Sequence, residues 1–285
     1  MSAAAPAPAT AAWLPDGRLH LHHGPIDLIL QAEGPGRAAA LRRAATRFDT
    51  VLAELVAELP LLRAPAPCAP QGVVARRMAA AVAPFLPAFI TPMAAVAGSV
   101  ADEILAALLA GPGIVKAHVN NGGDIALHLS PGQSATAAIA TDPPARLTLT
   151  AEDGIAGIAT SGWRGRSHSL GIADSVTVLA TTAAGADAAA TMIANAVDLP
   201  GHPAIVRRPA AEIAPDSDLG PRPVTIDVGP LTGPEIARAL SRGAALTDRL
   251  IAAGHIHTAA LVLGGEIRSI GAARLLCPGR ATARA

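Results

Sequence analysis

The sequence has 285 residues, of which 51% are hydrophobic and 2% are aromatic, and its acidic and basic residues are equal in number. This is a globular composition whose core must consist mainly of small aliphatic side chains. The zero net charge argues against a broad electrostatic surface for nucleic acid or for an anionic membrane. We therefore expect a small-molecule ligand, and one domain over residues 13–285 preceded by a disordered tail of residues 1–12.

Several familiar chemistries are disfavoured by single residues. Lys116 is the only lysine, so a Gly-Lys-Ser/Thr phosphate loop is absent and any lysine chemistry would rest on this residue. Cys68 and Cys277 form no CxxC pair, and the N-terminus has neither a basic nor an apolar export region. We expect a cytoplasmic protein with two free thiols. The most apolar stretch, residues 93–110, contains Asp102 and is predicted to be too short to span a membrane.

The first third of the chain predicts a hairpin and three helices. Alternating apolar residues predict the hairpin at 18–31, and three- and four-residue steps predict helices at 37–59 and 73–82. Pro92 opens a third helix whose small residues allow close packing. His20 and His22 share one strand face, where they either bind a metal or, as the pattern favours, face solvent. Asp102 interrupts an apolar helix face, and periodicity favours a surface charge paired with an arginine.

The middle of the chain predicts strands around a polar corner. An antiparallel meander is expected from strands at 113–119, 125–129, 135–140 and 147–150. Its first turn, at Gly122-Gly123, requires positive φ angles and is either a simple hairpin or a place where a ligand approaches. The polar stretch 157–171 is either a long hairpin tip or a ligand-contacting loop. An exposed Trp163 beside Arg164 and Arg166 favours the second alternative.

The last third predicts two helices and more strands. Strands are expected at 175–180 and 224–228, helices at 186–197 and 234–253, a loop-rich region at 198–222, and a hairpin at 258–263 and 266–270. Asp187 and Thr191 stand four residues apart on one helix face, where both could offer oxygen to Mg²⁺. Alternatively, Asp187 lies in the first turn of the helix and only makes a favourable interaction with the helix dipole. His255 and His257 repeat the histidine pattern and are interpreted as structural unless they meet His20 and His22.

Four motifs occur in the order seen in ApbE-type proteins, whose best-known members are FAD:protein FMN transferases. They are the helix ending Val100-Ala101-Asp102, the corner Asn121-Gly122-Gly123-Asp124, the loop Thr160-Ser161-Gly162, and Asp187 with Thr191 after a Val-Thr-Val strand. The chain more closely resembles an uncharacterised cytoplasmic branch of this superfamily. That likeness extends over nearly the whole chain and includes Thr91-Pro92-Met93 and Trp163-Arg164-Gly165-Arg166.

The resemblance implies an α+β fold, with antiparallel sheets flanked by helices, that binds FAD or FMN together with Mg²⁺. Asp187 and Thr191 would be the metal ligands. The residues expected to bind the cofactor are Asp102, Asn121, Gly122, Gly123, Asp124, Ser161, Gly162, Arg164 and Arg166.

Two departures from the transferases bear on activity. Ala97-Gly98 stands where they carry Lys-Gly, and Ser167-His168 begins a segment that differs from their His-x-x-x-Pro-x-Thr-Gly. Nucleotide binding is therefore better supported than transfer. Three hypotheses remain: a divergent Mg²⁺-dependent flavin-nucleotide transferase or hydrolase, a non-catalytic nucleotide-binding protein, and an accessory subunit of a metabolic complex. Homo-oligomerisation stays open.

Overall fold

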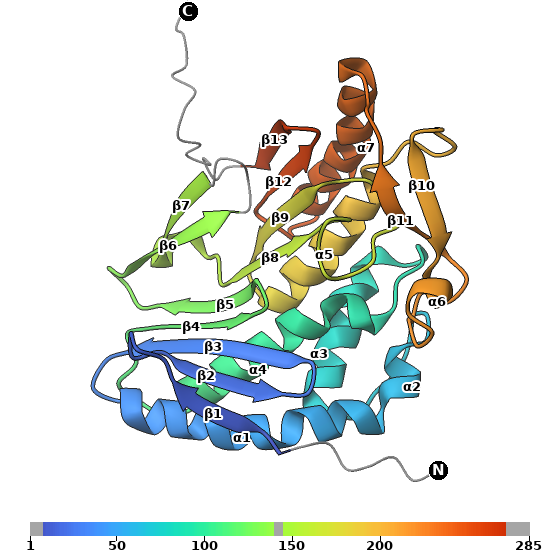
Figure 1. Ribbon diagram of the computed structural model, residues 1–285. Coiled ribbons are helices and arrows are strands. Elements are labelled where there is room, and N and C mark those ends of the chain that lie inside the picture. Colours follow the sequence, from blue (N-terminus) through green and yellow to red (C-terminus); the bar gives the residue numbers. More distant parts are fainter. Residues whose placement is uncertain (1–7, 140–144, 272–285) are drawn as a thin grey trace, which may run out of the picture.

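A nine-stranded antiparallel sheet organises the fold. The computed structural model describes residues 8–139 and 145–271. The strand order is β1-β2-β3-β4-β5-β8-β9-β12-β13, which runs across the whole molecule (Figure 1). These strands are β1 Thr10–Trp13, β2 Leu19–His23, β3 Ile26–Glu33, β4 Lys116–Asn121, β5 Asp124–Leu129, β8 Gly157–Ser161, β9 Ser175–Ala180, β12 Thr258–Leu263 and β13 Glu266–Gly271.

Four long helices cover one face of this sheet, each above two strands. Helix α1 (Arg37–Ala57) contacts β2 and β3, α4 (Val96–Leu109) contacts β4 and β5, α5 (Ala183–Ala196) contacts β8 and β9, and α7 (Gly233–Ala252) contacts β12 and β13. The shorter helices are α2 Leu59–Leu62, α3 Val73–Val82, α6 Ala210–Ile213 and the 3₁₀ turns Ala83–Phe85, Pro92–Ala95 and Ala151–Asp153. The predicted α+β class is confirmed.

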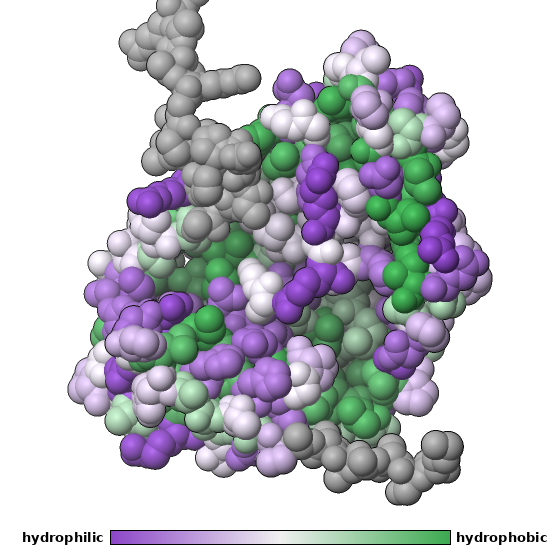
Figure 2. Space-filling model, viewed as in Figure 1, coloured by the Kyte–Doolittle hydropathy of each residue, from purple (hydrophilic) through white to green (hydrophobic). Residues whose placement is uncertain are grey.

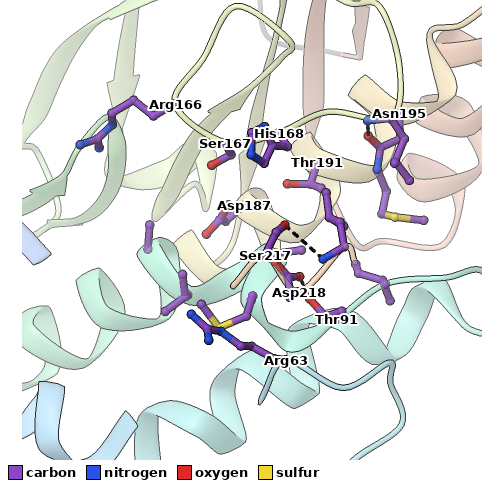
Figure 3. A pocket seen from close by; sticks show the side chains of 18 of the residues that line it. Arg63, Thr91, Arg166, Ser167, His168, Asp187, Thr191, Asn195, Ser217 and Asp218 are labelled. Carbon is purple, nitrogen blue, oxygen red and sulfur yellow. Dashed lines mark hydrogen bonds between the residues drawn. The ribbon is translucent and has the colours of Figure 1, made fainter. Parts of the chain in front are cut away.

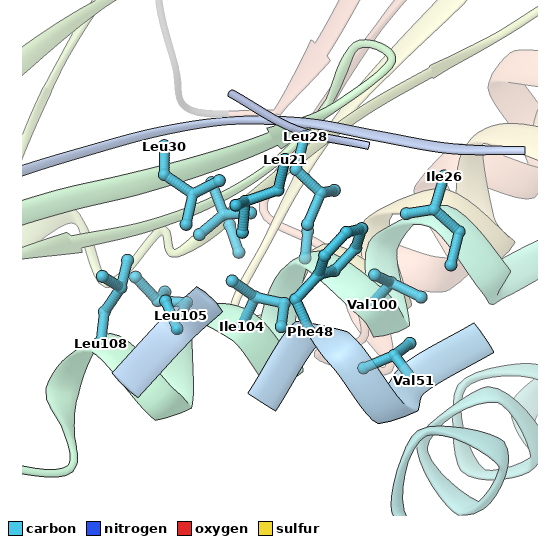
Figure 4. Packing of buried hydrophobic residues seen from close by; sticks show 14 of the residues in the cluster. Leu21, Ile26, Leu28, Leu30, Phe48, Val51, Val100, Ile104, Leu105 and Leu108 are labelled. Atoms are coloured by element: carbon cyan, nitrogen blue, oxygen red, sulfur yellow. The ribbon is translucent and has the colours of Figure 1, made fainter. Parts of the chain in front are cut away.

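The core follows directly from the two periodicities in the sequence. Alternate residues of β2 and β3, including Leu21, Leu28 and Leu30, are fully buried against α1 and α4. Phe48 of α1 reaches into the middle of this layer (Figure 4). Burial of a leucine or phenylalanine side chain stabilises the fold by roughly 1.5–3 kcal/mol, so this layer fixes the N-terminal half of the sheet. A second cluster around α5 and α7 fixes the other half.

The predicted meander is wrong at its middle step, since β5 does not pair with β6 (Ser134–Ile139), although β4 with β5 and β6 with β7 (Ala145–Thr150) form hairpins as expected. Strands β6 and β7 pair with each other in a separate sheet, whereas β5 pairs with β8. Ile158 and Ala159, neighbours in β8, are both buried, so both faces of this strand are covered and it suits a central position. Strand β7 instead contributes Leu147 and Leu149 to a small cluster with Leu127, Ile158 and Leu179.

Several predicted boundaries also change. β1 begins inside the expected tail 1–12, because residues 10–12 pair with β2. β8 takes up the start of the expected loop 157–171. The loop-rich region 198–222 contains β10 (Ile205–Pro209) and α6, and β10 pairs with β11 (Pro223–Val228) in a two-stranded sheet. α5 begins at Ala183, three residues earlier than expected, with Thr182 accepting the Gly185 N–H.

The apolar segment Pro92–Leu109 requires a correction of another kind. By length and composition alone, it is the one segment in the described part of the chain that could cross a membrane. However, 56% of it is buried inside the protein. Its central residues Val100, Ala101 and Ile104 are fully buried against α1 and the sheet. A buried core helix satisfies the same length and composition criteria, and this is how α4 is used here.

Candidate functional site

The site is organised around the crossing of α4 and α5, two helices that cap one another. At Gly98 of α4, an added Cβ would lie 2.3 Å from the Ala183 carbonyl oxygen, so glycine is what lets the helices touch. The Gly98 N–H donates to Asp187 Oδ2 of α5 at 3.0 Å. In return, Asp102 of α4 accepts the N–H groups of Ala183 and Ala184 at 3.0 and 2.9 Å. Each carboxylate thus satisfies first-turn N–H groups of the other helix.

The Asp102 carboxylate is fully engaged in this helix contact. Both its oxygens accept backbone N–H groups, and its side chain lines a surface pocket with Arg77 and His255, away from the polar corner. Burial raises the pKa of Asp102, and the two backbone hydrogen bonds oppose this shift. The alternative of an arginine-paired surface charge is not what the structure shows. We assign Asp102 a capping role, in place of the predicted contact with a nucleotide.

Asp187 faces a cavity of about 350 Å³, which we call the central cavity. Figure 2 shows a hollow on this face of the molecule, with hydrophobic residues on one wall and hydrophilic residues around its mouth. Thr191 lines the cavity one helical turn after Asp187, so the predicted shared face is confirmed (Figure 3). Asp187 is the fifth residue of α5, beyond the first turn, so the dipole alternative does not describe it.

Asp124 reaches the same cavity from the start of β5. Burial raises the pKa of Asp124 to about 6, while the Thr160 N–H and Arg166 oppose the shift. Burial and the negative charge of Asp124 together raise the pKa of Asp187 well above its usual range. Two carboxylates whose charged forms are both disfavoured by burial, one of them also by its neighbour, form an arrangement that a divalent cation would stabilise.

The glycine corner positions this carboxylate and an arginine. Gly122 and Gly123 adopt φ angles of 63° and 118°, as the sequence predicted, so β4 turns directly into β5. Arg166 Nη2 donates to the Gly122 carbonyl at 3.3 Å, and a Cβ at Gly122 would overlap the guanidinium group. Asn121 is buried and donates to the Ala97 carbonyl at 3.0 Å, which joins the corner to the start of α4.

The other predicted loop residues lie at a different place. Ser161, Gly162 and Arg164 line a second depression with the Gly264-Gly265 turn, which we call the Arg164 cleft. Asp174 accepts hydrogen bonds there from Trp163 Nε1 at 3.2 Å and from Arg164 Nε at 2.6 Å. Trp163 is half-buried beneath Arg164, so the expected exposed stacking surface does not exist. The sequence grouped the two arginines, whereas the fold sends Arg166 to the central cavity and Arg164 to this cleft.

The sequence patterns predict no ligand contact for the opposite wall of the central cavity. That wall consists of Arg63, Thr91, Asp216 and Asp218, together with Ser217 and Leu219. Arg63 Nη2 bonds Asp216 Oδ2 at 2.8 Å, and Thr91 donates to Asp218. Ser167, His168 and Asn195 add to the polar lining, and the apolar lining includes Phe89, Ile90, Met93 and Met192. Local patterns gave no signal for this wall, because its charged residues belong to short irregular segments.

The histidine pairs and the lysine stay apart from this cavity. His20 bonds Asp27 at 3.0 Å with its ring 6.4 Å from His22, and β2 lies near the opposite end of the sheet from β12, so His255 and His257 do not meet them. No group of three or more histidine, cysteine, aspartate or glutamate side chains within 8–139 and 145–271 is arranged to hold a metal. Lys116 Nζ lies 3.9 Å from Glu33 Oε1 of the neighbouring strand β3.

Comparisons with known proteins agree with the motif analysis at family level. A family model described as AbpE bacteria matches residues 11–269. UPF0280 proteins from Methanopyrus kandleri and Methanothermobacter thermautotrophicus are 39% and 38% identical over 145 and 149 residues. Each alignment covers 50% of this chain, and this chain spans 56% and 57% of the two relatives.

The comparison with solved structures gives a more distant match. The apo form of the Pseudomonas stutzeri flavinyl transferase ApbE aligns with 95% of this chain and 96% of its own, at 13% identity and a TM-score of 0.43. A likeness of this degree assigns no role to individual residues.

Proposed function

The chain belongs to the family described as AbpE bacteria, and from this membership and the geometry of the central cavity we propose that it binds a flavin nucleotide with Mg²⁺ there. The observation that carries the proposal is the meeting of Asp124 and Asp187, which are far apart in sequence, in one cavity. Burial disfavours the charged form of both, and the charge of Asp124 further disfavours that of Asp187. A pair of this kind is a typical partner for a hard cation.

The donor set suits Mg²⁺ better than a metal that needs a full protein cage. Asp124, Asp187 and the Thr191 hydroxyl offer only oxygen, and Mg²⁺ is usually held by one or two carboxylates plus ligand phosphates and water. Within the part of the chain that the structure describes, no group of three or more histidine, cysteine, aspartate or glutamate side chains could hold a metal by itself. When bound, the ion would supply positive charge to a phosphate group.

The remaining lining suits a ligand with an anionic end and a flat apolar end. Arg166 and Arg63 provide guanidinium groups, which pair with phosphate oxygens in a fork geometry. Phe89, Met93 and Met192 provide apolar surface for a ring system. The cavity volume lies at the lower end of the range for small-molecule sites.

Binding without transfer is the second candidate, and one observation favours it. Ala97, where the transferases carry lysine, lines the cavity, and Lys116 lies elsewhere on the sheet beside Glu33. Arg63 and Arg166 are therefore the cations on the cavity wall in the described part of the chain. We propose that ligand binding is retained while phosphoryl transfer is weak. An accessory subunit that keeps only the fold would bind no flavin nucleotide.

The test is a titration of FAD, followed by its visible absorbance, with and without Mg²⁺. We expect Mg²⁺-dependent binding by the parent. Asp187→Asn keeps an acceptor for Gly98 but removes the charge, and it should weaken binding by more than about tenfold, since even outer-shell partners of a metal matter on this scale.

The matched control is Asp102→Asn, which removes the corresponding carboxylate from the other helix cap outside the central cavity. It should lower thermal stability while changing the FAD affinity by less than about threefold. Mg²⁺-dependent binding by Asp187→Asn at the level of the parent would show that this carboxylate is not a ligand.

A further inference from the structure

One wall of the central cavity is a loop that closes on itself. At its neck, the Ala210 N–H bonds the Arg222 carbonyl at 2.9 Å and the Ala211 N–H bonds the Gly220 carbonyl at 2.8 Å. The turn from 214 to 219 between them supplies the cavity residues. We call residues 210–222 the rim loop. Compact loops whose ends meet in this way often act as functional units.

The rim loop is weakly attached to the rest of the protein. Every residue from 211 to 222 is at least partly exposed, whereas Ala210 at its first end and Val224, two residues beyond its last, are fully buried. A segment with few buried apolar contacts opens locally at low free energy, and its buried ends serve as fixed points. Its side-chain ties to the opposite side are Arg63 with Asp216, Thr91 with Asp218, and Arg222 over the Phe89 ring.

The Arg63–Asp216 ion pair is the contact that an anionic ligand would compete with. Both residues line the cavity, and their side chains are 35% and 75% exposed (Figure 3 shows Arg63 beside the loop). An ion pair this exposed is weak. A phosphate group accepts two parallel hydrogen bonds from a guanidinium, which is the stronger arrangement. An anion entering the cavity can therefore displace Asp216 from Arg63.

We propose that the rim loop is a lid over the central cavity and that Arg63 is its latch, holding Asp216 until a phosphate group of the ligand takes its place. The inference deepens the proposed function by assigning recognition of a phosphorylated ligand, and entry to its site, to these two residues. Ligand binding then breaks the Arg63–Asp216 ion pair. The two residues therefore affect the affinity in opposite directions, because Arg63 binds the anion and Asp216 competes with the anion for Arg63.

The opposite signs give the test, which uses inorganic pyrophosphate with Mg²⁺ as the probe in calorimetric titrations of the full chain. Arg63→Gln should weaken pyrophosphate binding by about tenfold or more, because it removes a charged hydrogen-bond donor. Asp216→Asn should strengthen binding by up to about fivefold, the equivalent of the ~1 kcal/mol that an exposed ion pair contributes at most.

Two further variants separate the latch from simple charge repulsion. Asp218→Asn removes a cavity carboxylate that contacts Thr91 instead of Arg63, and Glu212→Gln removes a charge paired with Arg208 on the same loop. Both should strengthen pyrophosphate binding by less than about half the factor seen for Asp216→Asn. Equal effects of Asp216→Asn and Asp218→Asn would show that general charge repulsion, instead of a specific Arg63–Asp216 pair, limits pyrophosphate binding, and would overturn the proposal.

Hydrogen exchange of the unliganded protein tests the lid without any ligand. Amides of residues 211–220 should exchange together, and both Arg63→Gln and Asp216→Asn should accelerate them several-fold relative to the parent. Unchanged exchange in both variants, affinity changes of the same sign, or no pyrophosphate binding by the parent would each overturn the proposal. If pyrophosphate behaves as expected but FAD does not bind, the latch stands and the flavin assignment fails.

Discussion

At the scale of single residues, two aspartate carboxylates in the contact between α4 and α5 have different roles. Asp102 and Asp187 both cap a neighbouring helix, but only Asp187 also faces the central cavity and feels a second carboxylate. The difference lies in position, since Asp102 lines a separate surface pocket with Arg77 while Asp187 shares the central cavity with Asp124. A carboxylate in a helix pattern therefore has no single meaning until its surroundings are known.

The raised pKa of Asp124 predicts that stability rises on mild acidification. Its folded-state pKa of about 6 exceeds the ordinary value of 3.8, so its contribution is fully present below the unfolded pKa and is lost as the pH rises through about 6. From about pH 7 to about pH 5, this group should add about 1 kcal/mol, or ~3 °C in Tm.

The measurement is the Tm of the parent and of Asp124→Asn across this pH range, since all other ionisable side chains are shared by both proteins. The variant should lack the added increment. Mg²⁺ should raise the Tm of the parent more at the upper pH than at the lower, because protons and the cation compete for the same carboxylates. Identical pH profiles for the two proteins would contradict the assignment.

Both cysteines are predicted to be free thiols in the native protein. Cys68 is a free thiol whose pKa is raised by partial burial and by Glu58, which lowers its reactivity, and Cys277 lies outside the described residues. A thiol titration of freshly prepared protein, under denaturing and non-reducing conditions, should find two thiols per chain. Finding none would mean that the cysteines are paired.

At the scale of elements, the close approach of α4 and α5 depends on Gly98. Gly98→Ala would place its Cβ 2.3 Å from the Ala183 carbonyl oxygen and must push the helices apart, which typically costs 1–3 kcal/mol or ~3–10 °C in Tm. The change should also weaken any Mg²⁺ response, because it displaces the N–H that holds Asp187. Thermal unfolding with and without Mg²⁺ measures both effects.

Gly233 offers the matched control for this substitution. It lies in the first turn of α7 with nothing within 4 Å of an added Cβ, so Gly233→Ala should leave the Tm unchanged or slightly higher. Equal Tm values for Gly98→Ala and the parent would show that the two helices can separate without cost.

At the scale of the whole molecule, we expect transfer of FMN to a protein threonine to be slow or absent even where FAD binds. Transfer needs positive charge where the transition state becomes negative, and the loss of one such donor commonly costs roughly two to three orders of magnitude in rate. By the resemblance to the transferases, Ala97 stands where they carry lysine, so we expect compensation to depend on Arg63 and Arg166, which line the cavity.

The assay is incubation with FAD, Mg²⁺ and a flavinylation-acceptor domain, read as flavin fluorescence in a denaturing gel. Little or no labelling is expected. Strong labelling that disappears in Asp187→Asn would contradict this prediction and make the protein a genuine transferase.

The sequence by itself determined most elements and some local geometry. The spacing of apolar residues predicted α1 and the first hairpin, the glycine pair predicted the turn before Asp124, and four-residue spacing placed Asp187 and Thr191 on one face. Such features depend on neighbours a few residues away, so a single sequence can reveal them.

Only the tertiary structure decided which of these features meet. It placed β8 beside β5, brought Asp124 to Asp187, made Asp102 a helix cap and set Arg63 opposite Asp216. Strand order and helix contact are fixed by how buried faces fill the core together, and a charge spacing carries no information about that packing. The central cavity exists because helices and loops from distant parts of the chain pack around it.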